Sequence, residues 1–291
     1  MTQLLDSLLA NVPVLLDGAW GTELHSRGLS PGESPDAWNL THPDDVAAVA
    51  RAYTEAGSAI VLTNTFGANR ITLARYGLAS RCREINQRGV ELSGEGSAGK
   101  ASVFASMGPT GALTLSGDVT YDSLLEVYGE QAEALVSAGA AALVIETMSD
   151  LTEARAAVAA ARATAVPVVA CMSFDSGREG DRTMMGVTPE EAARELSAAG
   201  AHVIGANCGQ GIEGYFHLCE RLRHATPLPI WIKPNAGLPE LVDGKTRYRE
   251  TPSAFASCVP RLLSAGASFI GGCCGTTPAT VNAVRLALQS R

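Results

Sequence analysis

One design recurs four times along this chain of 291 residues, and it limits the folds that the chain can adopt. Each copy has an alanine-rich stretch, an Ala-Gly pair, a short apolar run and then a polar residue. The copies are Ala56-Gly57 with residues 60–64, Ala138-Gly139 with residues 143–146, Ala199-Gly200 with residues 203–208, and Ala265-Gly266 with residues 269–274. Glycine just after a helix adopts the left-handed conformation that ends it, and apolar runs between helices are typical of strands buried on both faces. The repeat therefore predicts helices that alternate with the strands of a parallel sheet.

Four further apolar segments complete a set of eight strand–helix units. They are residues 14–16, 102–107, 166–173 and 229–235. Eight units predict an α/β protein with the (β/α)8 TIM-barrel fold, and we expect residues 1–291 to form one such domain because only short linkers separate the units. A doubly wound open sheet is the alternative, but no Gly-x-Gly-x-x-Gly turn or phosphate-binding loop follows an early strand. In a barrel the polar residues of the repeat would meet at the carboxyl ends of the strands, where active sites lie.

The composition argues against several classes of partner. The formal net charge is −8 and lysines and arginines form no dense run, which argues against nucleic acid and against an anionic membrane surface. No apolar stretch suits a transmembrane helix, and the first residues do not resemble a signal peptide. Seven cysteines in such a chain suit a reducing compartment, so we expect a cytoplasmic protein whose thiols are free or metal-bound.

Three cysteines follow predicted strands at one side of the barrel. Cys208 ends the sixth strand, and the adjacent Cys273 and Cys274 end the eighth, within the glycine-rich stretch 271–278. Strands six and eight are roughly 10 Å apart before curvature brings their side chains closer, and zinc with Zn–S bonds of about 2.3 Å can bridge such a gap. Small buried hydrophobic residues are the alternative interpretation of a cysteine pair. Three thiolates would leave one position open, as in catalytic zinc sites.

Asn235 ends the seventh strand, between the strands that carry the thiols. Its side-chain oxygen is a candidate for the remaining zinc position, and a turn residue of the Pro-Asn-Ala-Gly sequence is the alternative. None of the five histidines is assigned to the metal. The other cysteines are interpreted as packing residues, namely Cys82, Cys171, Cys219 and Cys258.

Taken together, the motifs resemble those of the zinc-dependent homocysteine S-methyltransferases, and most of all the homocysteine-binding module at the N-terminus of cobalamin-dependent methionine synthase. The resemblance extends over nearly the whole chain. It rests on the sequences at residues 16–22, 63–66, 145–147, 205–209, 234–239 and 271–278. It implies a (β/α)8 barrel, zinc ligation by Cys208, Cys273 and Cys274, and homocysteine binding by Asp17 and Glu146.

The chemistry of the implied reaction suits these residues. A zinc-bound thiol loses its proton near neutral pH and stays nucleophilic, so homocysteine could be methylated to methionine without a separate base. Asp17 and Glu146 would accept charge-assisted hydrogen bonds from the substrate ammonium, and backbone N–H groups around Gly18 and Ala19 would hold its carboxylate. An ion pair with an arginine is the alternative for Glu146. Further substrate contacts at the rim or in a second layer are expected at Asn64 and Thr65.

The methyl donor is less clear than the acceptor. The 291 residues leave no room for folate, cobalamin or reactivation modules, so we expect a methylated corrinoid supplied in trans, by a corrinoid protein or as free methylcobalamin. Gly275 stands where S-methylmethionine-dependent relatives usually carry arginine. Betaine, dimethylsulfoniopropionate or S-methylmethionine is the alternative donor, and its cation would need an aromatic cage, for which the candidates near strand ends are Trp20, Phe66 and Phe174.

Two alternative functions of a different class are also possible on the sequence. The chain could be a non-catalytic zinc–thiolate barrel, or a subunit of a multi-protein methyl-transfer system. A zinc hydrolase is disfavoured because such enzymes use histidine and carboxylate ligands, which leave zinc more Lewis-acidic than three thiolates do.

Overall fold

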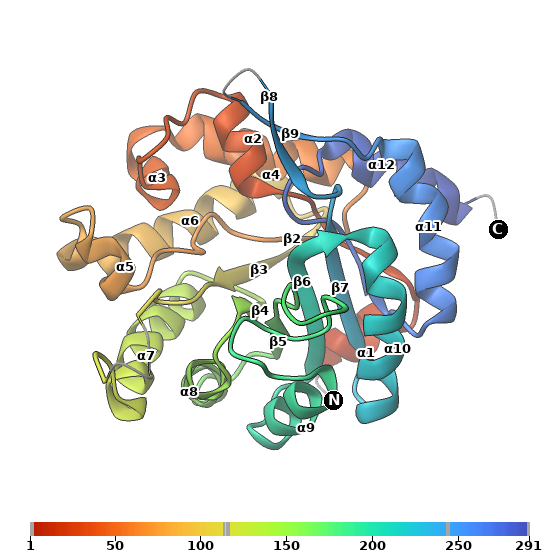
Figure 1. The fold of residues 1–291 in the computed structure, drawn as a ribbon. Helices are drawn as coiled ribbons and strands as arrows, with labels where there is room; N and C mark the ends of the chain where they lie inside the picture. The colour runs from red at the N-terminus through yellow and green to blue at the C-terminus, as the bar shows by residue number, and fades with distance from the viewer. Residues whose placement is uncertain (1–2, 113, 115–116, 243–244, 290–291) are drawn as a thin grey trace.

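The computed structural model describes residues 3–112, 114, 117–242 and 245–289. Eight parallel strands form one sheet in the order β1-β10-β7-β6-β5-β4-β3-β2. Their bounds are β1 Val14–Leu15, β2 Ile60–Val61, β3 Ser102–Met107, β4 Ala142–Met148, β5 Val168–Met172, β6 Val203–Gly211, β7 Ile230–Asn235 and β10 Phe269–Ile270. The first and last strands of this order meet, because Leu16 forms a parallel bridge with Ile60. The sheet therefore closes, which confirms the expected (β/α)8 barrel (Figure 1).

One long helix follows each barrel strand and packs on the outside of the sheet. These helices are α4 Pro43–Ala56, α6 Cys82–Ser97, α7 Tyr121–Ser137, α8 Leu151–Arg162, α9 Pro189–Ala198, α10 Tyr215–Ala225, α11 Pro252–Ser264 and α12 Pro278–Gln289. Shorter helices are α1 Gln3–Leu9, α2 Trp20–Ser26, α3 Trp38–Thr41 and α5 Arg70–Ala74, and 3₁₀ turns lie at Pro35–Ala37, Ala79–Arg81 and Ile212–Gly214. The glycine of each Ala-Gly pair has a positive φ, as the repeat predicts; in Gly57, which caps α4, φ is 108°.

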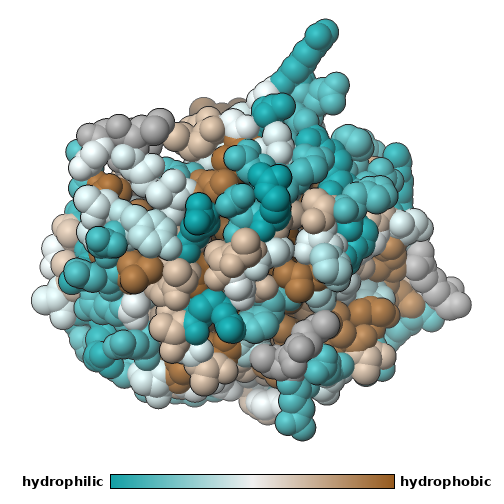
Figure 2. Space-filling model, turned by 90° about the horizontal axis from the view of Figure 1, so that it is seen from below, coloured by the Kyte–Doolittle hydropathy of each residue, from teal (hydrophilic) through white to brown (hydrophobic). Residues whose placement is uncertain are grey.

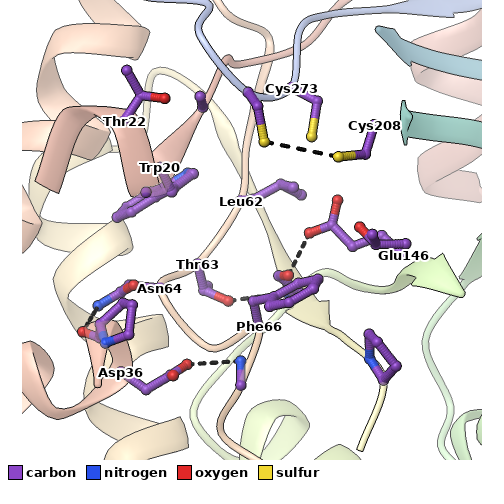
Figure 3. Close-up of a pocket in the computed structure, with 18 of the residues that line it drawn as sticks. Trp20, Thr22, Asp36, Leu62, Thr63, Asn64, Phe66, Glu146, Cys208 and Cys273 are labelled. Carbon is purple, nitrogen blue, oxygen red and sulfur yellow. Dashed lines mark hydrogen bonds between the residues drawn. The ribbon is translucent and has the colours of Figure 1, made fainter. Parts of the chain in front are cut away.

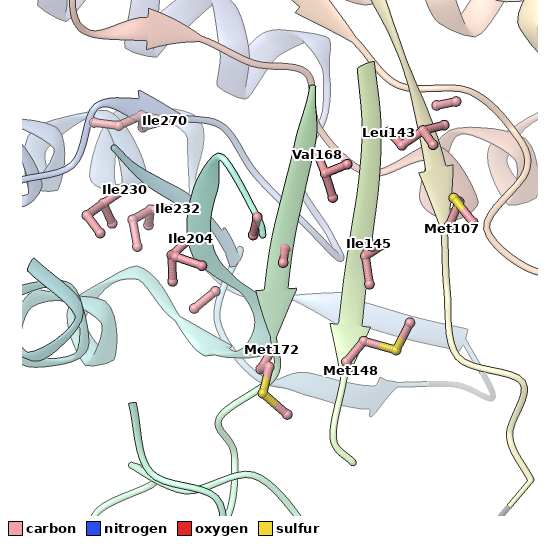
Figure 4. Close-up of a cluster of buried hydrophobic side chains, with 14 of the residues drawn as sticks. Met107, Leu143, Ile145, Met148, Val168, Met172, Ile204, Ile230, Ile232 and Ile270 are labelled. Atoms are coloured by element: carbon pink, nitrogen blue, oxygen red, sulfur yellow. The ribbon is translucent and has the colours of Figure 1, made fainter. Parts of the chain in front are cut away.

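Two apolar layers stabilise the barrel. The inner layer fills its interior with alternate strand residues, such as Phe104, Val144 and Trp231, and Leu5 of α1 packs against it. The outer layer lies between strands and helices and includes Leu143, Ile145, Met148, Val168, Met172, Ile204, Ile230, Ile232 and Ile270 (Figure 4). Both layers are filled by apolar side chains, so polar side chains at the carboxyl ends of the strands and in the segments that follow can build a site.

Among the described residues, the face opposite the top of Figure 1 carries no single large apolar patch. Seen from below, apolar side chains are dispersed among hydrophilic ones (Figure 2). Within the described part of the chain, every helix is too short or too polar to cross a bilayer.

A β-hairpin after β7 was not expected from the sequence. Its strands, β8 Pro239–Val242 and β9 Lys245–Tyr248, pair in antiparallel fashion with Pro239 opposite Tyr248. The hairpin lies outside the barrel sheet, above the loops in Figure 1. At its base, Ala236 N donates to Cys274 O at 2.9 Å and Glu250 N donates to Ala236 O at 3.3 Å. The hairpin is thus anchored beside the cysteine pair.

The strand ends differ in detail from the expected ones. Asn235 is the last residue of β7, as expected, but β6 continues past Cys208 to Gly211, with a shift of register between Asn207 and Gly211. The eighth barrel strand, β10, ends at Ile270, so Cys273 and Cys274 lie in the following turn. The close approach of the first strand explains the early end: a Cβ on Gly271 would lie 2.6 Å from Asp17 O.

Candidate active site

The three predicted thiols lie together at the carboxyl end of the barrel. Their sulfur atoms are all within 4.8 Å of one another, and the Sγ atoms of Cys208 and Cys274 are 3.8 Å apart (Figure 3). Sulfurs at the corners of a tetrahedron around zinc, with bonds of about 2.3 Å, are also about 3.8 Å apart. The donor set and its spacing therefore fit a tetrahedral metal ion.

The backbone at Cys208 is held in an uncommon conformation. Its φ of 63° is left-handed, which costs energy for a residue with a side chain. The hydroxyl of Tyr215 donates to Cys208 O at 2.5 Å and so holds this carbonyl group in place. The irregular backbone turns the thiol out of the strand pattern towards the cysteine pair.

The three thiols have different pKa values because they hydrogen-bond one another. Hydrogen bonds from Cys273 and Cys274 lower the pKa of Cys208 to about 3. The hydrogen bond with Cys208 raises the pKa of Cys273 well above its ordinary value. A hydrogen bond with Cys208 is also the main reason that the pKa of Cys274 rises to about 11. The cluster thus loses one proton readily and the other two reluctantly, and a bound cation would replace those two protons.

The side chain of Asn235 lies against the thiols. Its carboxamide hydrogen-bonds Cys208, while its Oδ1 atom is buried and has no hydrogen-bond partner. A buried acceptor without a partner is costly unless a ligand satisfies it. This orphaned oxygen beside three thiols supports the view that the residues here fit a metal ion.

A cavity of about 460 Å³ opens beside the thiols. Cys208, Cys273 and Cys274 form part of one wall, and Glu146 lies beside Cys208 (Figure 3). Lys233 also lines the cavity. The rest of the lining is largely apolar and aromatic or comes from loops, and it includes Gly18, Ala19, Trp20, Asn64, Phe66, Tyr76 and Pro109. The cavity has the size and polarity of a small-molecule site.

Glu146 faces this cavity as a buried carboxyl group. Ser106 Oγ donates to its Oε1 at 2.5 Å, and Asn207 Nδ2 lies 3.5 Å from its Oε2. Burial raises the pKa of Glu146 and outweighs the opposite effects of Lys233 and of the Ser106 hydrogen bond. The alternative expectation, an ion pair with arginine, is not what the structure shows, because the cation that influences Glu146 is Lys233.

Asp17 differs most from its expected place. Its side chain is fully buried and does not line the cavity. Its carboxylate accepts hydrogen bonds from Lys233 Nζ at 2.5 Å, Leu62 N at 2.7 Å and Trp20 Nε1 at 2.8 Å. Both oxygens therefore accept from protein donors, and the Asp17 side chain lies behind the cavity wall.

Of the remaining residues predicted to contact the substrate, some line the cavity and one lies in the layer behind its wall. Gly18 and Ala19 line the cavity, and a Cβ on Gly18 would lie 2.8 Å from atoms of Tyr53 and Thr276. Asn64 lines the cavity with its amide bound to Pro35 O. Thr65 is fully buried, and its hydroxyl donates to Ser106 O at 2.7 Å. Thr65 thus supports the wall without reaching the cavity.

Comparison with known proteins identifies the family. The model of the family described as homocysteine S-methyltransferase matches residues 14–288. The chain belongs to this family. Methionine synthase of Mycobacterium tuberculosis is 34% identical over 309 residues, with 99% of this chain and 26% of that protein covered. Methionine synthase of Mycobacterium leprae is 32% identical, with 99% and 25% covered. The chain thus spans about a quarter of the length of these relatives.

Solved structures of the family have the same fold. The metallated form of the homocysteine methyltransferase MmuM from Escherichia coli superposes with a TM-score of 0.80 at 26% identity, covering 97% of this chain and 98% of that one. The oxidized form of the same protein gives a TM-score of 0.81 at 26% identity, with 98% and 99% covered. Family membership therefore extends over the whole barrel.

Sequence reasoning missed several groups in this family member's site. A lysine at position 233, inside an otherwise apolar strand, was a usable signal, because buried lysines are almost always paired. Asn207 stands in a recognised motif, and its side chain clamps the backbone of Thr147, next to Glu146, by accepting from Thr147 N at 2.7 Å. Among the proposed cage aromatics, Trp20 and Phe66 line the cavity, but Phe174 is fully buried in the core.

Proposed function

We propose that Cys208, Cys273 and Cys274 hold a zinc ion and that the chain methylates the sulfur of homocysteine to give methionine. The observation that carries this proposal is the cluster of three sulfurs within 4.8 Å on the wall of a ligand-sized cavity. Thiolate ligands favour zinc over magnesium, calcium or manganese. A reducing compartment such as the cytoplasm suits a centre of free thiols.

Zinc held by three thiolates would supply a fourth position for the substrate's sulfur and keep that sulfur deprotonated near neutral pH. The chain's own residues then orient the substrate. Glu146 is the carboxyl group that faces the cavity, and it would accept from the α-ammonium group. The loop at Gly18 and Ala19 brings backbone N–H groups to the cavity wall for the α-carboxylate. Asn235 Oδ1 is the proposed ligand of the fourth position when no substrate is bound.

The proposal gives the two acidic residues, Glu146 and Asp17, different roles. Glu146 binds the substrate, whereas Asp17 acts through Lys233, Trp20 and Leu62, whose donors occupy its oxygens. Burial opposes the charge of Lys233, but Asp17 and Glu146 outweigh burial and raise its pKa. Lys233 therefore stays protonated and neutralises one of the two carboxylates.

For the methyl donor we propose a methylated corrinoid supplied in trans. The support is the match to methionine synthases at 34% and 32% identity. A small onium donor is a second candidate, and one observation favours it: the rings of Trp20, Phe66 and Tyr76 all line the cavity that contains the thiols. Aromatic faces attract quaternary ammonium and sulfonium cations.

Metal analysis tests the zinc centre. The purified protein should contain one zinc ion per chain, and Cys208→Ser, Cys273→Ser and Cys274→Ser should each lower zinc content and methionine formation. Cys258→Ser is the matched control, because Cys258 lies in α11 away from the cluster. Full zinc content in all three variants would overturn the assignment.

A donor screen tests the second half of the reaction. Methylcobalamin, betaine, S-methylmethionine and dimethylsulfoniopropionate are each offered with homocysteine to the zinc-loaded protein, and methionine is quantified. We expect the fastest methionine formation with methylcobalamin. Faster formation with a small onium compound would replace the corrinoid proposal with the second candidate. If no donor methylates homocysteine although zinc is bound, the chain is a non-catalytic zinc–thiolate barrel or needs a further subunit of a methyl-transfer system.

A further inference from the structure

Lys233 occupies an uncommon place for a lysine, between the apolar interior of the barrel and the ligand cavity. Side chains alternate along β7: Ile230 and Ile232 belong to the outer apolar layer, whereas Trp231 belongs to the inner one. Lys233 and Asn235 follow Trp231 on the same face of the strand. Lys233 is only 2% exposed, and it lines the cavity. The strand thus brings a buried ammonium group to the edge of the ligand cavity.

The ammonium group of Lys233 has more donors than the protein uses. One N–H group donates to Asp17 Oδ1 at 2.5 Å. A lysine ammonium has three donors, and the other two have no acceptor among the residues that the structure describes. Buried polar groups are almost always hydrogen-bonded. Since Lys233 lines the cavity, a bound ligand can supply the missing acceptor.

The neighbours of Lys233 place it next to the proposed site for the substrate's ammonium group. In the register of the sheet Lys233 is paired with Asn207 of β6, and Asn207 Nδ2 lies 3.5 Å from Glu146 Oε2. The next residue of β7, Pro234, accepts a backbone hydrogen bond from Cys273 N at 2.7 Å. Lys233 therefore lies between the carboxyl group that would bind the ammonium and the turn that carries two of the thiols.

A zwitterionic substrate needs a cation at this place, because its α-carboxylate would enter a cavity that already contains Glu146 and the thiols. Among the described residues that line the cavity, the cations are Lys233 and Arg75. Arg75 is exposed, and its guanidinium donates to Thr110 O at 2.9 Å. The N–H of Ala19, on the loop proposed to hold the carboxylate, already donates to a backbone oxygen at 3.4 Å. Lys233 is therefore the cation best placed for the carboxylate.

We propose that Lys233 is a substrate-binding residue whose ammonium group holds the α-carboxylate of the acceptor while it stays paired with Asp17. The inference rests on the proposed function and adds the basis of its selectivity. With Glu146 for the α-ammonium and Lys233 for the α-carboxylate, the site selects thiols that are amino acids. A charge-assisted hydrogen bond is stronger than a neutral one, so a thiol without the carboxylate loses a substantial contact. Such a thiol is 3-aminopropanethiol, the decarboxylated form of homocysteine.

Binding of these two thiols to zinc-loaded protein tests the proposal. By titration calorimetry, the wild-type protein should bind homocysteine roughly tenfold to a hundredfold more tightly than 3-aminopropanethiol. The double variant Asp17→Asn, Lys233→Met removes an anion and a cation together. It should bind homocysteine more weakly by the same factor and 3-aminopropanethiol almost unchanged. Arg75→Met is the matched control, because it removes the other cation of the cavity and should keep the preference.

Nuclear magnetic resonance of the wild-type protein gives a readout that does not depend on the folding of a variant. The chain has three lysines, Lys100, Lys233 and Lys245, so a sample with isotope-labelled lysine gives few signals. The ammonium protons of Lys233 should exchange slowly with water because the group is buried in an ion pair. Homocysteine should shift this ammonium signal much more than 3-aminopropanethiol does.

The possible outcomes separate this inference from the proposed function. An equal loss of affinity for both thiols in the double variant, or an equal shift of the Lys233 signal with both, would overturn the proposal and leave Lys233 as the partner of Asp17 alone. Loss of the preference in Arg75→Met would place the carboxylate at Arg75 instead. Failure of the wild-type protein to bind homocysteine at all would show that the proposed function itself is wrong.

Discussion

The charges around the cavity decide which groups can bind a zwitterionic amino acid. Asp17 and Lys233 form an ion pair of 2.5 Å whose side chains are 0% and 3% exposed. Their charges cancel, so Glu146 remains as the acid without a full countercharge. An incoming ammonium group would provide that countercharge. The raised pKa of Glu146, caused by burial, is consistent with a site that is completed by a cation.

Replacing this acid should therefore weaken substrate binding selectively. In Glu146→Gln we expect homocysteine to bind roughly tenfold to a hundredfold more weakly, because one hydrogen bond to a charged group contributes about 1.5–3 kcal/mol. Zinc content should not change, since Glu146 is outside the thiol cluster. Titration calorimetry with zinc-loaded protein measures the affinity and metal analysis measures the zinc content, with Glu55→Gln at the exposed face of α4 as the control. Unchanged affinity would leave Glu146 with a structural role only.

The buried ion pair makes a different prediction, about stability. Lys233→Met leaves Asp17 charged and unpaired in the barrel interior, which should lower the free energy of unfolding by about 3–5 kcal/mol. The double variant Asp17→Asn, Lys233→Met removes both charges and should recover much of the loss. Urea unfolding measures the effect. Arg249→Met is the control, because Arg249 is 82% exposed in its pair with Glu240 and should contribute little. A small loss in Lys233→Met would contradict the pairing.

Among individual residues, the sequence predicted the positions of only those that stand in a recognisable motif. The thiols, Glu146 and Asn235 lie at or near the carboxyl ends of strands and stand in short motifs, so their meeting could be foreseen. The pairing of Asp17 with Lys233 joins residues 216 positions apart and depends on the register of the closed sheet, which no local pattern encodes. For the same reason the sequence suggested a substrate contact at Asp17, although its oxygens are occupied by the protein.

Among the elements, the contact between α4 and α6 depends on a glycine. A Cβ on Gly96 of α6 would lie 2.3 Å from Ala47 O and 2.7 Å from Ala50 Cβ of α4. The two helices therefore touch backbone to backbone at this point. Gly94, two positions before Gly96 on the same helix, is exposed, and a Cβ there would have no atom within 4 Å.

These two glycines should respond in opposite directions to the same substitution. Gly96→Ala should lower the free energy of unfolding by about 1–3 kcal/mol, because the helices must separate to admit the methyl group. Gly94→Ala should raise it by about 0.5–1 kcal/mol, because alanine is the better helix former. Urea unfolding of both variants measures the difference. If the two values agree within error, the close packing of α4 on α6 is wrong.

Elements with a repeating pattern were easier to foresee than those without one. The Ala-Gly repeat and the apolar runs identified all eight barrel strands, since helix caps and buried strands leave local signals. The β8–β9 hairpin was missed, although Asp243-Gly244 is a turn dipeptide between its strands. Glu240, Lys245 and Arg247 interrupt these strands with charged residues, so they lack the apolar run by which the other strands were recognised. The consequence was that the ring of Tyr248 could not be placed against Gly275, the residue after the cysteine pair.

For the molecule as a whole, the fold and the proposed metal centre are separable. The apolar clusters that fill and surround the barrel contain Cys82, Cys171 and Cys219, but none of the three clustered thiols. Closure of the sheet likewise depends on Leu16, Ala59 and Ile60 at the strands, remote in the chain from the cysteine turn. A site built from the carboxyl ends of β6 and β7 and the turn after β10 can therefore gain or lose a ligand without the barrel unfolding.

Removal of the metal should accordingly abolish activity and leave the barrel intact. After dialysis against a chelator we expect an unchanged far-ultraviolet circular dichroism spectrum and a cooperative urea transition. The midpoint of thermal unfolding should fall, because an ion that binds only the folded state stabilises it by an amount set by its concentration and affinity. Readdition of zinc should restore the midpoint and methionine formation together. Loss of the helical signal on chelation, as in small zinc domains whose folding requires the metal, would show that the thiol centre stabilises the fold itself.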